Sequence, residues 1–463
     1  MSKKKVDFSN GIYDARQLGA PKMFILGAQH MFAMFGATVL VPALTGLSVS
    51  ATLLFAGLGT LLFHLLTKGK VPAFLGSSFA FIGGYAAITT IGADEAGNPI
   101  SDYSLLPYAC VGVACAGLLY LVLAGLIKAF GAKKVMRFFP PIVTGPIIIA
   151  IGLTLSSSAI SNCSSNWLIA VIAIAIVVVC NIWGKGMIKI IPIMLGVLGS
   201  TLVALILFLA FDMNTMDPEK FDALHEAAWI GLPFKLEDTV FGLFGGNVDK
   251  SFLVTAIITI MPIALATMVE HIGDISAISS TCKKNYIADP GLHRTLLGDG
   301  LATTLASLFG APANTTYGEN TGVLSLSKVY DPRVIRIAAV FAVLFSFSPK
   351  FAALVSMMPT ATIGGVSLVL YGMISAVGVR NIVENKVDFE KSRNVIIAAI
   401  ILVLSIGVNY AGAIQIPIGN ITISLSGLAV GALVGIILNA ILPGKDYEFG
   451  ADEKGDTAVN FKV

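Results

Sequence analysis

Long apolar stretches follow one another along almost the whole chain, and they decide what it can fold into. A helix that crosses a membrane needs about 20 mostly apolar residues, and the mean hydropathy of this chain is +0.86. Only 12% of its residues are charged, against about 25% in soluble domains. The sequence therefore predicts an all-α membrane protein. Its fourteen predicted transmembrane segments lie near 22–45, 50–67, 72–92, 104–128, 140–158, 166–184, 190–211, 252–281, 292–309, 314–330, 334–349, 358–379, 392–409 and 421–442.

The distribution of basic residues tests this number of segments. With the N-terminus inside, fourteen segments place 26 of the 30 lysines and arginines in cytoplasmic loops or termini. Such loops carry an excess of Lys and Arg in membrane proteins, so we expect both termini to be cytoplasmic, in a multi-pass protein of the cell (inner or plasma) membrane. The segment 212–250 is then an extracellular loop, and 443–463 a cytoplasmic tail. No signal-peptide pattern precedes the first segment.

Several function classes find no support in the sequence. The net charge is +3 without a long basic run, so a nucleic-acid partner is not expected. The five cysteines follow neither a disulfide nor a metal-ligand spacing. Acidic residues in the loops are scattered rather than clustered, so we expect no enzyme, no catalytic residues, no metal and no cofactor. A proton gradient is the expected source of energy.

Similar features recur at matching ranks in the two halves of seven segments. Pro141–Gly145 opens the fifth segment and Pro359–Gly364 opens the twelfth, while polar stretches at 75–80 and 314–320 open the third and the tenth. An odd number of segments per half inverts the second half relative to the first. Transporters commonly use inverted repeats and bind substrate where interrupted helices meet. The sequence predicts such a duplication, with chance similarity of Gly- and Pro-rich segments as the alternative.

Ionisable residues inside the predicted segments are few, and charge in a bilayer is costly enough to make each a functional candidate. Glu270, His271 and Asp274 lie in the eighth segment, Asp299 in the ninth and Glu319 in the tenth. Glu270 and Asp274 are four residues apart and share one helix face. His271 is turned by about 100° from Glu270, so we expect it to pack or to form hydrogen bonds between helices.

The polar start of the tenth segment predicts a substrate site for a planar cyclic amide such as uracil. Residues 314–316 suit an extended entry into a half-helix, and Gly318 lets a ligand approach the backbone. Free amides at the half-helix start would donate to ring carbonyls, and Glu319 or Glu270 would accept from ring N–H groups. Ser78 and Phe79 in the third segment supply the matching half, with Phe79 as a stacking surface. No Lys or Arg lies deep in a segment, which disfavours anion transport.

Six stretches resemble the nucleobase–ascorbate transporter family: 29–42, 68–84, 269–274, 289–294, 314–330 and 364–372. The resemblance covers about 22–442. It implies a core domain of segments one to four (22–128) and eight to eleven (252–349). It also implies a gate domain of segments five to seven (140–211) and twelve to fourteen (358–442). Short strands in segments three and ten would meet near mid-membrane, and a homodimer in lipid would work by an elevator-like shift of core against gate.

The resemblance also implies roles for single residues. Glu270 matches an acid that contacts uracil and takes part in proton coupling, and Glu319 matches the second uracil-binding acid. Phe79 and Gly318 match positions that offer backbone amides, and Tyr317 and Tyr371 match aromatic residues of the site. The complete expected substrate site is Glu270, Glu319, Phe79, Gly318, Tyr317, Tyr371, Ser78 and Asp274.

Departures from the family pattern keep alternatives open. Uracil-transporting members have a histidine in place of Asp274 and an amide near Asp299. Acids at these two places are similar to the purine-transporting branch. That branch usually has glutamine in place of Glu319. We therefore expect a secondary active transporter that imports uracil by proton symport. The alternatives are a purine or xanthine symporter of the same family and a sulfate-type anion transporter.

Overall fold

Long apolar helices dominate the computed structural model, which describes residues 11–93, 99–245, 248–418, 421–445 and 447. Within these ranges eight helices are long and apolar enough to cross a membrane, and a bent pair brings the number to nine. The eight are α1 (Ala20–Thr45), α2 (Val49–Leu66), α4 with its preceding turn (Tyr103–Phe130), α6 (Pro141–Ser164), α9 (Pro192–Phe211), the run α12–α13 (Lys250–Thr281), α18 (Thr360–Glu384) and α19 (Ser392–Ala411). The pair is α16 (Pro332–Ser346) with α17 (Pro349–Ser356), bent by 90°. The predicted helical membrane protein is confirmed at this level.

Shorter elements fill the space between these helices. They are β1 (Leu75–Ser77), α3 (Ile82–Thr89), α5 (Ala132–Met136), α7 (Trp167–Trp183), α8 (Met187–Ile190), α14 (Leu292–Leu308), β4 (Asn314–Thr316), α15 (Gly318–Ser327) and α20 (Gly427–Ile441). The segment 212–250 contains two short helices, α10 (Pro218–Glu226) and α11 (Val240–Leu243). The predicted tail after 443 lies outside the described residues, except for 443–445 and 447.

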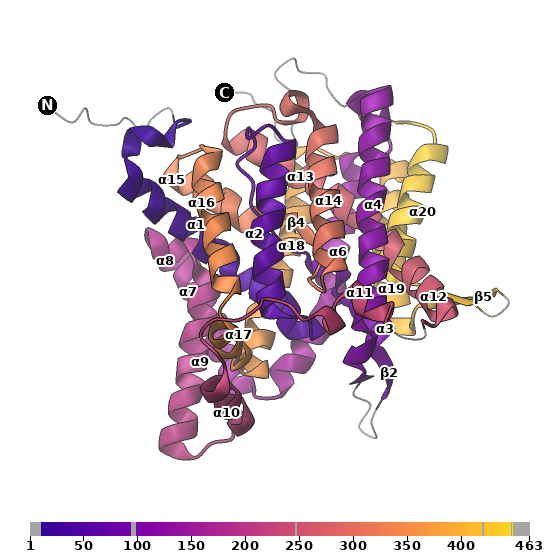
Figure 1. Cartoon of the computed structure of the whole chain (residues 1–463). Coiled ribbons are helices and arrows are strands. Elements are labelled where there is room, and N and C mark those ends of the chain that lie inside the picture. The colour runs from indigo at the N-terminus through magenta and orange to yellow at the C-terminus, as the bar shows by residue number, and fades with distance from the viewer. Residues whose placement is uncertain (1–10, 94–98, 246–247, 419–420, 446, 448–463) are drawn as a thin grey trace, which may run out of the picture.

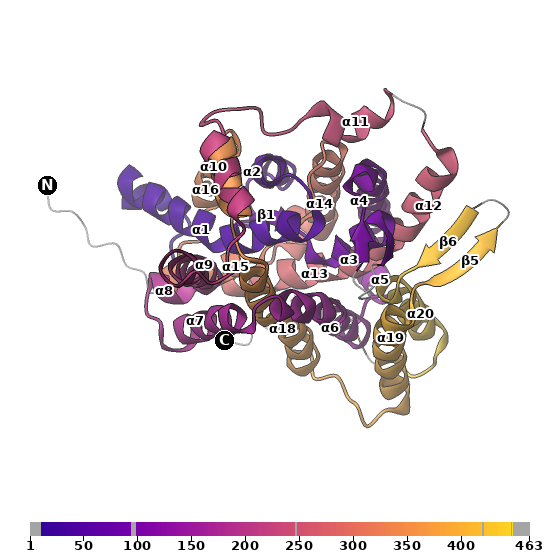
Figure 2. The same cartoon turned by 90° about the horizontal axis from the view of Figure 1, so that it is seen from below.

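Most of the long helices form two groups (Figures 1 and 2). One group contains α1, α2, α4, α14 and α16, in which α14 packs on α4 and α2, and α16 on α2 and α1. The other contains α6, α7, α9, α18, α19 and α20, in which α18 packs on α6 and α7, and α19 on α20 and α6. Seen from below, α13, α15 and β1 lie between the groups (Figure 2).

Two β-hairpins replace parts of the predicted helices. Strand β2 (Thr90–Ala93) pairs with β3 (Pro99–Ser101), and β5 (Ile414–Ile418) pairs with β6 (Ile421–Leu425). The predicted helical segments 72–92 and 421–442 are therefore wrong at 90–92 and at 421–425. Alternating β-branched residues favour a strand once a partner is available, and apolar content alone does not distinguish the two structures. The last helix begins only after Ser426, whose side chain accepts a hydrogen bond from the Ala429 amide.

Close packing of α6 on α18 depends on glycine. A Cβ atom at Gly152 would collide with the carbonyl oxygen of Tyr371 and with Ser375, whose hydroxyl donates to the Ile149 carbonyl at 3.0 Å. Small residues let membrane helices approach in this way.

Gly152→Val is therefore expected to lower the thermal unfolding temperature of the purified protein, with an overpacking cost of about 1–3 kcal/mol. Gly125→Val in α4 is the control, because a Cβ there meets no atom within 4 Å. Equal unfolding temperatures for the two variants would contradict the packing argument.

Candidate functional site

Two short strands, β1 and β4, pair in the middle of the molecule, and we call this pair the crossing. Strands β1 and β4 are antiparallel and buried, with Leu75 opposite Thr316 and Ser77 opposite Asn314. The backbone pairing continues on both sides: Ser78 N donates to Ala313 O at 2.8 Å, and Tyr317 N donates to Phe74 O at 3.0 Å. Hydrogen bonds between the strands satisfy non-helical backbone groups that lipid would leave unpaired.

Each strand leads directly into a helical segment that begins without a side-chain cap. Tyr317 precedes α15, and Ser78 precedes the single turn Phe79–Phe81 before α3; neither provides a capping hydrogen bond. The first N–H groups of a helix have no partner within it, and they favour negative or carbonyl groups. Gly318 borders open space, because a Cβ there would meet no atom within 4 Å. This end of α15 can therefore donate to a ligand.

Three carboxylates lie on elements that meet at this crossing, since α13 packs against β4 and α15. Glu270 and Asp274 lie one turn apart on α13, and Glu319 lies in the first turn of α15. Asp274 Oδ2 accepts a hydrogen bond from the Thr316 hydroxyl of β4 at 2.9 Å. Glu270 Oε2 is buried and has no hydrogen-bond partner among the described residues. The predicted site acids are thus brought together, and Glu270 keeps an unused acceptor.

A second, fully buried pair lies beside these acids, on a face of α13 turned by about 100° from Glu270. His271 Nδ1 lies 3.1 Å from Asp299 Oδ2 on α14, and both side chains are 0% exposed. The rings of Phe63 and Tyr120 meet the imidazole edge-on, with centroids 6.3 and 6.5 Å away. The expectation that His271 contacts other helices is confirmed. Asp299 of α14 thus contacts His271.

Tyr317 holds the crossing together. Its hydroxyl donates to Ser77 O at 2.9 Å and accepts from the Thr38 hydroxyl at 3.3 Å. A Cβ at Gly76 would collide with the Tyr317 ring, so glycine at 76 lets the ring lie on the strand. The side chain of Tyr317 thus fixes β1 relative to α1 and α15.

Aromatic residues connect the crossing to the other helix group. The ring of Phe79 meets the ring of Tyr371 on α18 edge-on, with centroids 5.9 Å apart and an interplanar angle of 75°. The Tyr371 and Ser78 hydroxyl oxygens are buried without a hydrogen-bond partner in the described part of the chain. The contact between Phe79 and Tyr371 therefore joins the turn that follows β1 to α18.

Two polar contacts of the site were not predicted. One is the bond from Thr316 to Asp274. The other joins Asn320 of α15 to α1: its Nδ2 donates to His30 O at 3.1 Å and lies 3.1 Å from His30 Nδ1. The polar run that begins at Asn314 indicated that these residues matter, but no periodic pattern names the partner of each side chain.

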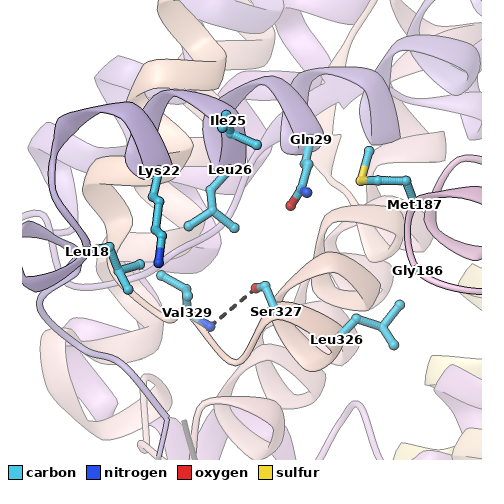
Figure 3. Close-up of a pocket in the computed structure, with 10 residues that line it drawn as sticks. All are labelled: Leu18, Lys22, Ile25, Leu26, Gln29, Gly186, Met187, Leu326, Ser327 and Val329. Carbon is cyan, nitrogen blue, oxygen red and sulfur yellow. Dashed lines mark hydrogen bonds between the residues drawn. The ribbon is translucent and has the colours of Figure 1, made fainter. Parts of the chain in front are cut away.

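A cavity of about 460 Å³ lies between α1, the start of α8 and the end of α15 (Figure 3). The side chains of Lys22 and Gln29, from α1, point into it, and Met187 of α8 lies at its edge. Ser327, at the end of α15, also lines it, and its hydroxyl accepts from Val329 N at 3.2 Å. The cavity thus lies at the end of α15 that is remote from Glu319.

Thr316→Val is expected to destabilise the protein, because the buried Asp274 carboxyl loses the hydroxyl that donates to it. Leaving a buried acceptor unsatisfied costs about 1–3 kcal/mol. Thr315→Val is the matched control, since the Thr315 hydroxyl of the same strand is buried without a partner among the described residues. Thermal unfolding of both purified variants measures the difference, and an equal loss in both would contradict this role of Thr316.

Comparison with known sequences assigns the chain to a family. The sequence model of a permease family matches residues 21–441. The chain belongs to this family, the nucleobase–ascorbate transporters. The uracil permease of Bacillus subtilis strain 168 is 38% identical over 477 aligned residues that cover 100% of both chains. The uracil permease of Bacillus caldolyticus is 40% identical, over 91% of this chain and 92% of its own.

Solved structures place this nucleobase–ascorbate transporter family member in a wider fold class. The transmembrane domain of the cyanobacterial bicarbonate transporter BicA has a TM-score of 0.56 at 14% identity, and 94% of this chain and 100% of that chain are covered. The murine anion transporter Slc26a9 has a TM-score of 0.58 at 12% identity, over 90% and 67%. These likenesses concern the fold. The sequence relatives are permeases, so the chain is a membrane transporter rather than an enzyme.

Proposed function

We propose that this chain imports uracil across the cell membrane together with protons. The observation that carries the proposal is the group of three carboxylates, Glu270, Asp274 and Glu319, beside the uncapped start of α15. Acceptors and backbone donors then surround the open space at Gly318. The relatives named uracil permease, 38% and 40% identical, support uracil as the ligand.

The ring of uracil complements this arrangement. Its N–H groups would donate to Glu319 and to Glu270, whose Oε2 has no partner among the described residues. Its carbonyl groups would accept from backbone amides at Phe79 and Gly318, next to the uncapped helix starts. The Phe79 ring would stack on the ligand, and Tyr317 and Tyr371 would line the site. Ser78, with its unpartnered hydroxyl, is a further donor.

In this proposal, Glu270 is the residue that binds and releases the transported proton. A carboxylate inside a membrane without a cation is costly, and no ion pair of Glu270 occurs within the described ranges. Binding a proton removes that cost while the loaded site moves. Asp274 already accepts from Thr316, so Glu270 is the better candidate for exchanging a proton in each cycle.

The fourteen-segment architecture is part of the proposal, because the elements fit it in order. Segments three and ten would be β1 with α3 and β4 with α15. Segment eight would be the run α12–α13, segment nine α14, and segment eleven α16. The remaining segments would be α1, α2, α4, α6, α7, α9, α18, α19 and α20 in order. The nine recognised by length and composition include the bent pair, and the five further segments are β1 with α3, α7, α14, β4 with α15, and α20.

Matched helix contacts support an inverted repeat. Each segment has a counterpart of equal rank in the other half. If every segment is replaced by its counterpart, the contact between α2 and α16 becomes the contact between α14 and α4. The same exchange turns α7–α9 into α19–α20, α18–α7 into α6–α19, and α18–α9 into α20–α6. Every one of these contacts is present. A duplicated and inverted ancestor explains such pairing.

The two helix groups correspond to the proposed core and gate domains. The core would comprise 22–128 and 252–349, and the gate 140–211 and 358–442. In this proposal the boundary between core and gate would include the Phe79–Tyr371 contact and the cavity in Figure 3. An elevator-like shift of core against gate would open and close this boundary. Cytoplasmic termini, a 212–250 loop outside and a homodimer complete the proposal, with orientation supported by the distribution of Lys and Arg.

The purine alternative rests on Asp274 and Asp299. Asp274 accepts from Thr316, and Asp299 lies 3.1 Å from His271. Because both acids already have contacts within the protein, Glu319 is the better guide to the substrate. Sulfate-type transport would need a cation at the site. In the described residues, no ion pair or hydrogen bond joins Glu270, Asp274 or Glu319 to a Lys or Arg.

Ligand binding to the purified protein tests the substrate. Titration calorimetry with uracil, xanthine and sulfate is expected to give heat of binding for uracil and a weaker or absent signal for the others. Binding of xanthine in preference to uracil would replace this proposal with the purine alternative.

A further inference from the structure

A charged cavity of about 540 Å³ lies apart from the site described above. It is formed by the connections between α2 and β1, α13 and α14, and α15 and α16, at the end of the bundle where α1 begins (Figure 1). Its charged lining is Lys70, Lys284, Arg333, Arg336, Asp289 and Asp331. Its volume is in the range of small-molecule sites, and the predicted orientation places it on the cytoplasmic side.

Two of the four cations are paired with acids. Lys70 Nζ lies 2.5 Å from Asp289, and Arg333 Nη1 lies 3.2 Å from Asp331 and 2.9 Å from Asp14. A hydrogen bond from Arg16 holds the pKa of Asp14 well below its usual range, so this carboxylate stays ionised and shared between two arginines.

The other two cations, Arg336 and Lys284, have no carboxylate partner among the described residues. The Nε atom of Arg336 is buried there without any hydrogen-bond partner. Lys284 Nζ lies over the ring of Tyr13, 4.3 Å from its centroid. Burying the Arg336 donor without an acceptor costs free energy, and the exposed Lys284 adds a second positive charge on the same lining. The arrangement therefore favours an anion that contacts both side chains.

We propose that this cavity binds the phosphate of a phosphomonoester through Arg336 and Lys284. Four cations face two carboxylates on the lining, and a phosphomonoester carries about −1.5 to −2 charges with three acceptor oxygens. Guanidinium groups suit phosphate geometry, and lysine adds a point charge. The phosphate belongs either to a soluble cytoplasmic compound or to a lipid headgroup of the adjacent leaflet.

The same connections hold the ends of the functional helices. The Tyr13 hydroxyl donates to Cys282 O at 2.8 Å, and Ala15 N donates to Asp331 Oδ2 at 2.7 Å, so the N-terminal segment closes one side of the cavity. Cys282 directly follows α13, and Asp331 directly precedes α16. A bound phosphate would cross-link these segments and raise the thermal unfolding temperature.

The test is thermal unfolding of the purified full-length protein in detergent with uridine monophosphate, inorganic phosphate or uridine, at ionic strength matched with potassium chloride. The first two are expected to raise the unfolding temperature in a saturable way, and uridine to leave it unchanged. Arg336→Gln and Lys284→Gln should each remove the shift. Lys133→Gln, an exposed residue of α5, should keep it.

A second arm distinguishes the two sources of phosphate. Phosphatidic acid and phosphatidylcholine are added to the same micelles. A shift with phosphatidic acid alone, lost in Arg336→Gln, assigns the cavity to a lipid headgroup. The proposal is overturned if no phosphate compound shifts the unfolding temperature. It is also overturned if the shift is the same in the wild type and in both the Arg336→Gln and Lys284→Gln variants.

Discussion

Replacing Glu270 by glutamine is expected to abolish proton-driven accumulation of uracil while leaving uracil exchange across the membrane intact. Glutamine resembles the protonated acid in shape and still offers a carbonyl acceptor to the ring, but it cannot release a proton. The buried Oε2 of Glu270, which has no partner in the described residues, is the atom on which the coupling is proposed to depend.

Radiolabelled uracil in proteoliposomes measures both activities. With an inward proton gradient, the Glu270→Gln variant should only equilibrate uracil, and with uracil on both sides it should exchange label at a rate near that of the wild type. Glu384→Gln is the control, because Glu384 pairs with Arg380 at 2.6 Å near the end of α18, away from the site. Normal accumulation by the Glu270 variant would remove this residue from proton coupling.

Replacing Glu319 by glutamine is expected to weaken uracil binding by about tenfold to about 150-fold. A hydrogen bond to a charged group contributes about 1.5–3 kcal/mol, and each 1.4 kcal/mol is about a factor of ten in Kd. Glu319 lies in the first turn of α15, where the helix start also favours a negative charge. The change therefore removes the charge that recognises a ring N–H group and leaves the backbone donors in place.

Calorimetric titration of the Glu319→Gln variant with uracil and xanthine gives the comparison. The loss for uracil should exceed any loss for xanthine, since the purine-transporting branch resembles this variant at position 319. The Glu384→Gln protein again serves as the matched control. Unchanged affinity for uracil would mean that Glu319 does not pair with the ring.

Apolar content and polar interruptions were enough to predict much of the architecture. The polar stretches at 75–80 and 314–320 contain the strands β1 and β4, and the face shared by Glu270 and Asp274 meets Thr316 of β4. The turn of His271 away from that face followed from helix geometry alone. These features depend on residues close together in sequence, which a single chain reveals.

Other features depend on partners far apart in sequence and were missed. Residues 421–425 are apolar enough for a helix, yet they pair with 414–418 as a strand. The bond between Asn320 and His30 joins α15 to α1 across 290 positions. The cavity around Arg336 and Lys284 is built from three connections and the N-terminal segment, each of which looks like an ordinary basic loop in the sequence.

Uptake of radiolabelled uracil by the wild-type protein in proteoliposomes tests the central claim most directly. An inward proton gradient is imposed, and unlabelled uracil, xanthine, hypoxanthine and sulfate compete. If the central claim is correct, uptake requires the gradient and is blocked by unlabelled uracil but not by xanthine, hypoxanthine or sulfate. Gradient-driven uptake of xanthine without uracil uptake would contradict it, and would make Asp274 and Asp299, rather than Glu319, the residues that indicate the substrate.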